Sequence, residues 1–236
     1  MNALLVRVGA DRSKGGGMWN GPVDLRTGQF VYVAIPENRP LHSGLEKPYR
    51  TLEPALEKFG ARLPKNLASR HMHLDPDFGH LTYGDQGDRA KQLRDNLQAG
   101  DLILFYASLT DINGAAPLVY ALIGLFVVEK LLLAAEVPPH EYDINAHTRR
   151  ILKPDATDLI VRAKATVSGR LNQCLPIGEY RDRAYRVRQD LLEAWGGLSV
   201  KDGYLQRSAR LPRFLDPPSF LRWLAVQRPT FISANN

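Results

Sequence analysis

The sequence predicts an α+β protein with a mixed or antiparallel central sheet and peripheral helices. Two apolar runs in the middle of the chain, residues 101–107 and 118–128, are rich in β-branched and aromatic residues, as buried strands are. Strand and helix patterns do not alternate regularly, which argues against a doubly wound parallel sheet. Hydrophobic residues make up 44% of the chain, enough for a sizeable core. We expect the sheet to be curled, in the extreme case into a partial barrel.

The elements of the first part of the chain follow from local patterns. Residues 3–8 are apolar with high β-propensity and predict a first strand, and residues 29–36 predict a second. Thr51 is expected to cap a short helix that ends at Gly60. Residues 70–88 are polar and contain four glycines or prolines, which predicts a loop.

The second part of the chain is predicted in the same way. The strand that begins at residue 118 is expected to continue to Leu133. The other predicted elements are a helix over 87–98, a strand with one solvated face over 159–167, a turn at 168–170, a helix over 182–195 and a last helix after Asp216. No long linker rich in Pro, Gly or Ser divides the chain, so we expect one domain over residues 1–236.

The net charge of +6 is unevenly distributed. Residues 1–157 carry 18 Lys and Arg and 18 Asp and Glu, whereas residues 158–236 carry 13 Lys and Arg and only 7 Asp and Glu. A basic C-terminal part attached to a neutral body favours contact with a polyanion, nucleic acid first. A solvated arginine-rich face without a partner is the alternative.

Cysteine content and hydropathy limit the class of protein. A single cysteine, Cys174, excludes an internal disulfide and a multi-cysteine metal site. The longest uncharged apolar stretch, residues 115–128, is shorter than the roughly 20 residues of a transmembrane helix. The N-terminal segment reaches a charge at Arg7, too early for a secretory signal. We therefore expect a cytoplasmic protein without membrane contact.

The glycine-rich loop between the first two predicted strands is the first candidate site. Gly16 and Gly17 allow the backbone to approach a ligand closely, but the spacing is neither that of a Walker A loop nor that of a dinucleotide fingerprint. Trp19 offers a surface on which a base can stack, Asn20 offers hydrogen bonds to a base edge, and Asp24 adds a carboxylate. The alternative is a hairpin loop with its tryptophan packed in the core.

The second candidate is a cluster of histidines and aspartates. In one interpretation, His71 and His73 bind a metal with Asp75 or His80 as a third ligand. No distant matching ligand is apparent, so we expect no metal. In the other, Asp85 or Asp75 acts as a base or charge stabiliser that His73 orients. A network of Asx turns, without function, is the remaining alternative.

The third candidate is the bend near residues 168–171. Arg170 on a glycine-assisted bend can bind a phosphate with two hydrogen bonds, although a plain surface arginine explains it equally well. Cys174 has no close cationic neighbour in sequence, so we expect a buried structural thiol.

Several of these segments resemble a known family. They are residues 5–9 (LVRVG), 19–24 (WNGPVD), 30–37 (FVYVAIPE), 73–78 (HLDPDF) and 81–85 (LTYGD). Together they resemble the third type of nucleotide modification associated domain of bacteria and phages, over most of the chain. This resemblance implies a role in handling modified DNA bases. Residues 100–107 and 168–171 are also similar, over a short length, to base-binding domains of the PUA and EVE type, which implies a partial PUA-like barrel and a pocket for an everted base.

The resemblance and the candidate residues lead us to expect a DNA glycosylase that everts and excises a modified, possibly glycosylated, base of phage DNA in antiviral defence. The expected catalytic residues are Asp24 first, then Asp85, with His73. The expected substrate contacts are Trp19, Asn20, Gly16, Gly17, Asp75, Tyr83 and Tyr106. The expected DNA contacts are Lys14, Arg70, Arg89, Lys91 and Arg170. The partner is double-stranded DNA with modified bases, and no cofactor is expected.

Other functions fit the same residues. A non-catalytic reader would bind the modified base and recruit a partner nuclease. An enzyme of free nucleotides would bind without strong salt dependence. If Lys14 attacked the sugar as an amine, the glycosylase would also nick the strand through a Schiff base.

Overall fold

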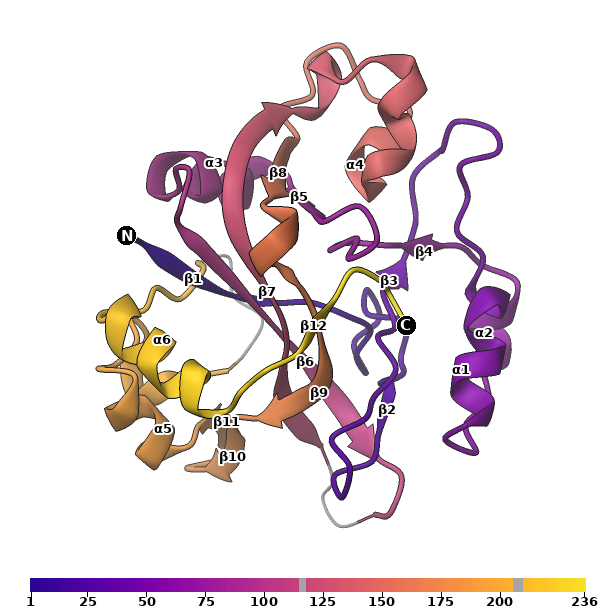
Figure 1. Cartoon of the computed structure of the whole chain (residues 1–236). Coiled ribbons are helices and arrows are strands. Elements are labelled where there is room, and N and C mark those ends of the chain that lie inside the picture. Colours follow the sequence, from indigo (N-terminus) through magenta and orange to yellow (C-terminus); the bar gives the residue numbers. More distant parts are fainter. Residues whose placement is uncertain (115–117, 206–209) are drawn as a thin grey trace.

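A computed structural model describes residues 1–114, 118–205 and 210–236 (Figure 1). Its centre is one mixed sheet. β1 runs parallel to β6, and the other pairings along the main path of the sheet are antiparallel. That path is β1 (Ala3–Arg7), β6 (Leu102–Asp111), β7 (Val119–Leu133), β8 (Leu159–Ala163) and β5 (Thr82–Asp85). The α+β class with a mixed central sheet is confirmed.

The long strand β7 pairs with β9 (Gly169–Pro176) and with β8 in addition to β6. Its first part pairs with β9 and its last part pairs with β8. β12 (Phe231–Ile232) extends the sheet beyond β9, and β2 (Pro22–Val23) joins the end of β6. Among the described residues no pairing connects β1 to β5, so the sheet stays open and is not a closed barrel.

Both faces of the sheet are buried, which explains the uninterrupted apolar runs in the sequence. Alternate residues of β6 enter different clusters: Ile103 and Phe105 pack on one side, Leu104 and Tyr106 on the other. The first side is covered by α1 (Glu53–Glu57), α2 (Lys65–Ala68) and α3 (Gly87–Asn96). The second is covered by α5 (Gln189–Ala194) and α6 (Pro217–Val226).

Short elements complete the chain. Two small antiparallel pairs lie outside the main sheet: β3 (Ile35–Pro36) with β4 (Met72–His73), and β10 (Gly178–Arg181) with β11 (Ala184–Val187). One further helix, α4 (Ala146–Arg149), starts at an Asn145 cap. The 3-10 helices are Tyr49–Leu52, Ala134–Glu136, Pro139–Ile144, Ala165–Val167 and Lys201–Gly203. Within the described ranges, no helix has the length and apolarity to cross a bilayer.

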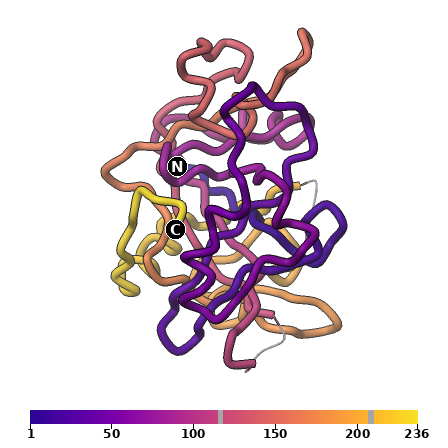
Figure 2. Tube along the Cα trace, turned by 90° about the vertical axis from the view of Figure 1, so that its right-hand side faces the viewer, coloured from indigo at the N-terminus to yellow at the C-terminus, as the bar shows by residue number. Residues whose placement is uncertain are grey.

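The C-terminal residues lie beside the N-terminal half of the chain, as the yellow and purple traces of Figures 1 and 2 show. Asn236 bonds the backbone of Tyr32 twice: its Oδ1 accepts from the amide at 2.8 Å and its Nδ2 donates to the carbonyl at 3.0 Å. Asn235 Oδ1 accepts from the amide of Phe78 at 2.8 Å, and its Nδ2 donates to Asp77 Oδ1 at 3.0 Å. Two asparagine side chains therefore fasten this end to distant loops.

The strongest patterns of the sequence are confirmed. The first strand, the two central strands and the helices near residue 90 and after Asp216 occur where the periodicity places them. Asp216 caps α6 by accepting from the amide of Ser219 at 3.1 Å. The helix near Thr51 is also present, although its first turn is a 3-10 helix.

Four local predictions are wrong. The strand expected over 29–36 is reduced to β3, because residues 30–34 are buried without a partner strand in a regular ladder. The loop expected over 70–88 contains β4 and β5. The helix expected over 182–195 begins with β11 and becomes helical only at Gln189. The predicted turn at 168–170 instead opens β9.

Candidate functional site

A polar cavity of about 200 Å³ lies where β1, β5, α3 and α4 approach each other. Its wall includes the backbone of Gly84, which lies at the centre of β5. Six of its side chains are polar or ionisable: Arg7, Asp75, Tyr83, Asp85, Arg89 and His147. Because these residues come from distant parts of the sequence, the sheet must form before the cavity exists.

Asp75 follows β4 and is fixed by two donors. Its Oδ1 accepts from the amide of Gly84 at 2.8 Å and from Nδ2 of Asn145 at 2.9 Å. The side chain is only 6% exposed. Burial raises the pKa of Asp75 to about 6, which the charge of His147 and the two hydrogen bonds oppose.

His73 and His147 are each held through Nδ1 by a carboxylate. His73 Nδ1 lies 2.7 Å from Glu37 Oε2, and His147 Nδ1 lies 2.5 Å from Asp158 Oδ1. Arg150 binds both oxygens of Glu37 at 3.0 Å, as a guanidinium binds an ionised carboxylate. Burial lowers the pKa of His73 to about 4, so the ring is neutral near pH 7.

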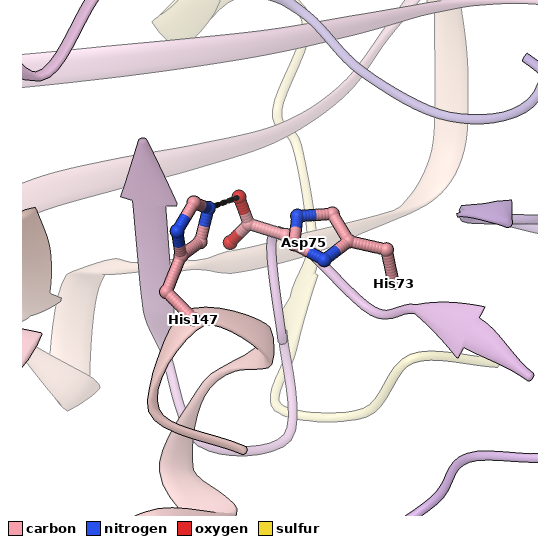
Figure 3. Close-up of side chains that lie close together, drawn as sticks. All are labelled: His73, Asp75 and His147. Carbon is pink, nitrogen blue, oxygen red and sulfur yellow. Dashed lines mark ion pairs between the residues drawn. The ribbon is translucent and has the colours of Figure 1, made fainter. Parts of the chain in front are cut away.

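These contacts orient both rings. An ionised carboxylate only accepts hydrogen bonds, so each Nδ1 donates a proton to its carboxylate. Arg150 NH2 also lies 3.0 Å from Nδ1 of His73. In the neutral ring of His73, Nε2 then carries a lone pair. Figure 3 shows Asp75 between the two rings, with a carboxylate oxygen towards His147. One atom from each of His73, Asp75 and His147 lies within 4.8 Å of the other two. Two imidazoles and a carboxylate in this arrangement form a set of ligands that suits a metal ion.

A second polar group lies on the opposite part of the cavity wall. Tyr83 OH donates to Asp85 Oδ2 at 2.6 Å, and Arg89 NH2 donates to the Tyr83 oxygen at 2.9 Å. Arg89 Nε lies 2.7 Å from the same Asp85 oxygen. Asp85 therefore presents a carboxylate whose orientation is set by two neighbours.

The glycine-rich loop forms a separate recess. Trp19 and Asn20 line a cavity of about 390 Å³ together with Arg12. Asn20 is buried and its Nδ2 donates to the carbonyl and the hydroxyl of Ser108, whereas its Oδ1 has no partner within the described ranges. Arg7 links the two regions, because it lines the 200 Å³ cavity and also an adjoining one that contains Asn20.

The structure thus brings several predicted site residues together. Asp75, Tyr83, Asp85 and Arg89 line one cavity, and His73 lies behind Asp75. His71 and His80, which the metal interpretation included, are exposed, and His80 pairs with Asp77 instead. His147 is the distant residue that the sequence pattern lacked, because it lies with His73 and Asp75 in one cluster.

Asp24 lies apart from this group. Its carboxylate organises a turn by accepting from the amide of Arg26 at 3.0 Å, from Thr27 Oγ1 at 3.0 Å and from Asn113 Nδ2 at 3.1 Å. These contacts lower its pKa, against the opposing effect of desolvation. Asp24 lines none of the cavities described above.

The predicted glycine and tyrosine contacts have structural roles as well. Gly16 packs against Asp11 so closely that a side chain would collide with it, and Gly17 has a φ of +91° that favours glycine. Tyr106 is buried in the second core cluster. None of these three lines the 200 Å³ cavity.

The predicted DNA-binding cations differ in their surroundings. Lys14 is exposed on the glycine-rich loop, and Lys91 is exposed but pairs with Asp95. Arg70 bonds the carbonyl of Glu37 and the side chain of Asn38. Arg170 is buried: it donates to the carbonyls of Leu171 and Ala234, lies over the ring of Phe30, and burial lowers its pKa to about 10.

Four residues of the site were not predicted as site residues from the sequence: Arg7, Glu37, His147 and Asp158. The position of His147 is set by the Asn145 cap, whose Oδ1 accepts from the His147 amide at 2.9 Å. The capping pattern Asn145-x-x-Thr148 could have marked a helix start there. It could not have shown which way the imidazole points.

The fold and the site define a mixed-sheet α+β domain with a small cavity in which carboxylate, guanidinium and imidazole groups meet. A family model described as nucleotide modification associated domain 3 matches residues 2–216. The chain belongs to this family, as its motifs predict, and so has a role associated with nucleotide modification. No curated protein and no solved structure gave a significant match.

Proposed function

We propose that the chain is an enzyme that excises a modified base from double-stranded DNA by hydrolysing the N-glycosidic bond. The observation that carries this proposal is the 200 Å³ cavity of a nucleotide modification associated domain, which is lined by the carboxylates of Asp75 and Asp85 and by the cations Arg7 and Arg89. Base excision needs negative charge beside the sugar and a group that activates water, and two carboxylates supply both.

Asp85 is the central catalytic group of this proposal. Arg89 and Tyr83 hold its carboxylate in one orientation, so it can stabilise the positive charge that develops on the sugar. Asp75 and His147 position a water molecule at the other side of the cavity. The bond from C1′ to the base nitrogen breaks and the base leaves with the electron pair. The water oxygen bonds to C1′, and its proton passes to Asp75.

Recognition of the base is assigned to the neighbouring recess. The unpaired Oδ1 of buried Asn20 is an acceptor suited to an exocyclic amino group, and Trp19 offers a stacking surface. Lys14 on the same loop and the cationic residues of 158–236 supply phosphate contacts. Asp24 is left out because it lines none of the described cavities, and Arg170 because its guanidinium is buried against the carbonyls of Leu171 and Ala234. The setting we propose is defence against phages with modified genomes.

The test is to incubate the purified chain with DNA from phages that carry different base modifications and to measure abasic sites. We expect abasic sites in one class of modified DNA and none in unmodified DNA. Borohydride trapping separates the two routes: a covalent adduct lost in Lys14→Ala indicates a lyase, and no adduct indicates hydrolysis alone. Tight binding to a modified DNA without any abasic product would contradict the enzyme and support a reader that recruits a nuclease.

A further inference from the structure

We propose that His73, Asp75 and His147 bind one divalent transition-metal ion, of the zinc or iron(II) type, at the wall of the 200 Å³ cavity. The three side chains come from β4, the loop after it and α4. They are almost fully buried, at 8% or less side-chain exposure. Ion binding at this place does not depend on the proposed function, whereas a role for the ion in base excision rests on it.

The first argument is the geometry of the cluster. Both Nδ1 atoms contact carboxylates outside the cluster, those of Glu37 and Asp158, so each ring has only Nε2 left for a further ligand. Asp75 uses Oδ1 for Gly84 and Asn145, and its Oδ2 lies 3.9 Å from His147 Nε2, beyond hydrogen-bond distance. One potential ligand atom of each residue therefore lies in a buried place within 4.8 Å of the other two.

The second argument is that both histidines are held by carboxylates outside the cluster. Histidines that bind metals almost always donate their other ring N–H to a carboxylate or carbonyl, which fixes the ring and raises the basicity of the ligand nitrogen. Both histidines here do so. Glu37 is in turn clamped by Arg150 with two contacts of 3.0 Å. A buried histidine that served packing alone would not need a carboxylate at its Nδ1, and here both histidines have one.

The third argument concerns the type of ion. Two imidazoles with one carboxylate are typical of catalytic zinc and of non-haem iron(II), whereas magnesium and calcium prefer oxygen ligands alone. Ligand atoms bound to one tetrahedral ion at roughly 2.0–2.2 Å lie about 3.3–3.6 Å apart. The three ligand atoms lie within 4.8 Å of one another, so binding needs a contraction of at most about 1.5 Å. Asp75 and His147 also line the cavity, so the free coordination positions face it.

If the proposed function holds, the ion would help to activate the water that attacks the sugar. A water molecule on a free coordination position would lie in the cavity that also contains Asp85, the group assigned to the sugar. A bound divalent ion lowers the pKa of such a water. The ion would then take over the positioning of water that Asp75 and His147 perform.

The experiment measures binding directly on the full chain. The purified protein is analysed for bound metals by mass spectrometry, stripped with a chelator, and titrated with Zn²⁺ by calorimetry and with Co²⁺ by visible absorption. We expect one ion per chain and a cobalt spectrum of a site with nitrogen and oxygen ligands. We also expect thermal unfolding to shift upward with ion concentration, as for any ligand that binds only the folded state.

Three variants make the result specific. His147→Gln should weaken Zn²⁺ binding by more than about 100-fold, and Asp158→Asn, which changes only the outer contact, by about 10- to 100-fold. The matched control is His71→Ala, which removes an exposed histidine two residues from His73 and should leave binding unchanged. Circular dichroism of each variant establishes that it is folded.

The outcomes separate the site from the function. No binding of Zn²⁺, Co²⁺ or Fe²⁺ by the folded wild-type chain, or equal weakening by His71→Ala and His147→Gln, overturns the ion site. Binding as expected without any abasic product leaves the ion site standing and overturns the proposed function. If abasic sites still form after chelation and no ion binds, the proposed function stands and the ion site is overturned.

Discussion

Gly84 and the imidazole of His147 are in direct contact across the cavity wall. A methyl group at Gly84 would lie 2.5 Å from Cδ2 of His147 and 2.7 Å from Oδ1 of Asn145. The amide of the same glycine also holds Asp75. A single residue of β5 therefore sets the position of two side chains that reach it from different parts of the chain.

Gly84→Ala should displace His147 and destabilise the fold. Overpacking a tight site costs about 1–3 kcal/mol of unfolding free energy, which denaturant titration measures. The double variant Gly84→Ala, His147→Ala is the control, because removal of the ring relieves much of the collision. Equal costs of Gly84→Ala in both backgrounds would contradict the contact.

Asp85→Asn should abolish base excision while the chain still binds DNA. Loss of a positioned carboxylate typically lowers the rate by about 10²- to 10⁴-fold, and single-turnover formation of abasic sites measures it. Asp95→Asn, an exposed aspartate on α3 that pairs with Lys91, is the matched control and should react at the wild-type rate. An active Asp85→Asn enzyme would remove Asp85 from the mechanism.

Lys14 and Arg170 should respond differently to substitution. Lys14→Ala removes an exposed cation and should reduce the salt dependence of DNA binding by about one phosphate contact. Arg170→Met should leave that dependence unchanged and instead lower the unfolding free energy by about 1–3 kcal/mol, because the buried carbonyl of Leu171 and the partly buried carbonyl of Ala234 lose their donor. A changed salt slope in Arg170→Met would show that this arginine reaches the DNA.

Cys174 should be unreactive in the folded protein. Burial raises its pKa to about 12, so the reactive thiolate is scarce at neutral pH. Because the unfolded chain ionises at lower pH, the contribution of this thiol to stability is complete below about pH 9 and declines as pH rises towards 12. A thiol reagent that releases a chromophore should react within minutes only after unfolding by guanidinium chloride. Rapid labelling of the native chain would contradict the burial.

Periodicity predicted the parts of the fold that depend on local burial. β6 and β7 are apolar on both faces because helices cover both, and their runs in the sequence are correspondingly continuous. Short elements were missed where tertiary contacts decide the structure. β5 reads as part of a polar loop, yet its four residues form a ladder because β8 lies beside them.

The candidate site was predicted only in part. Residues 73–85 were predicted as a candidate site because ionisable side chains are dense there, and Asp75 and Asp85 share a cavity. In the sequence, the two central strands β6 and β7 lie between Asp75 and His147, and no spacing rule connects the two residues. Asp24 and Asp75 have the same side chain. The fold gives Asp24 the partners of a turn and places Asp75 in a cavity wall, and the sequence does not show this difference.

The attachment of Asn235 and Asn236 has a practical consequence for handling the protein. Asp77, which Asn235 touches, is only two residues beyond Asp75. Substitution of both asparagines by alanine would remove the bonds to the Tyr32 backbone, to the Phe78 amide and to the Asp77 side chain. Variants that test the cavity should therefore retain both asparagines.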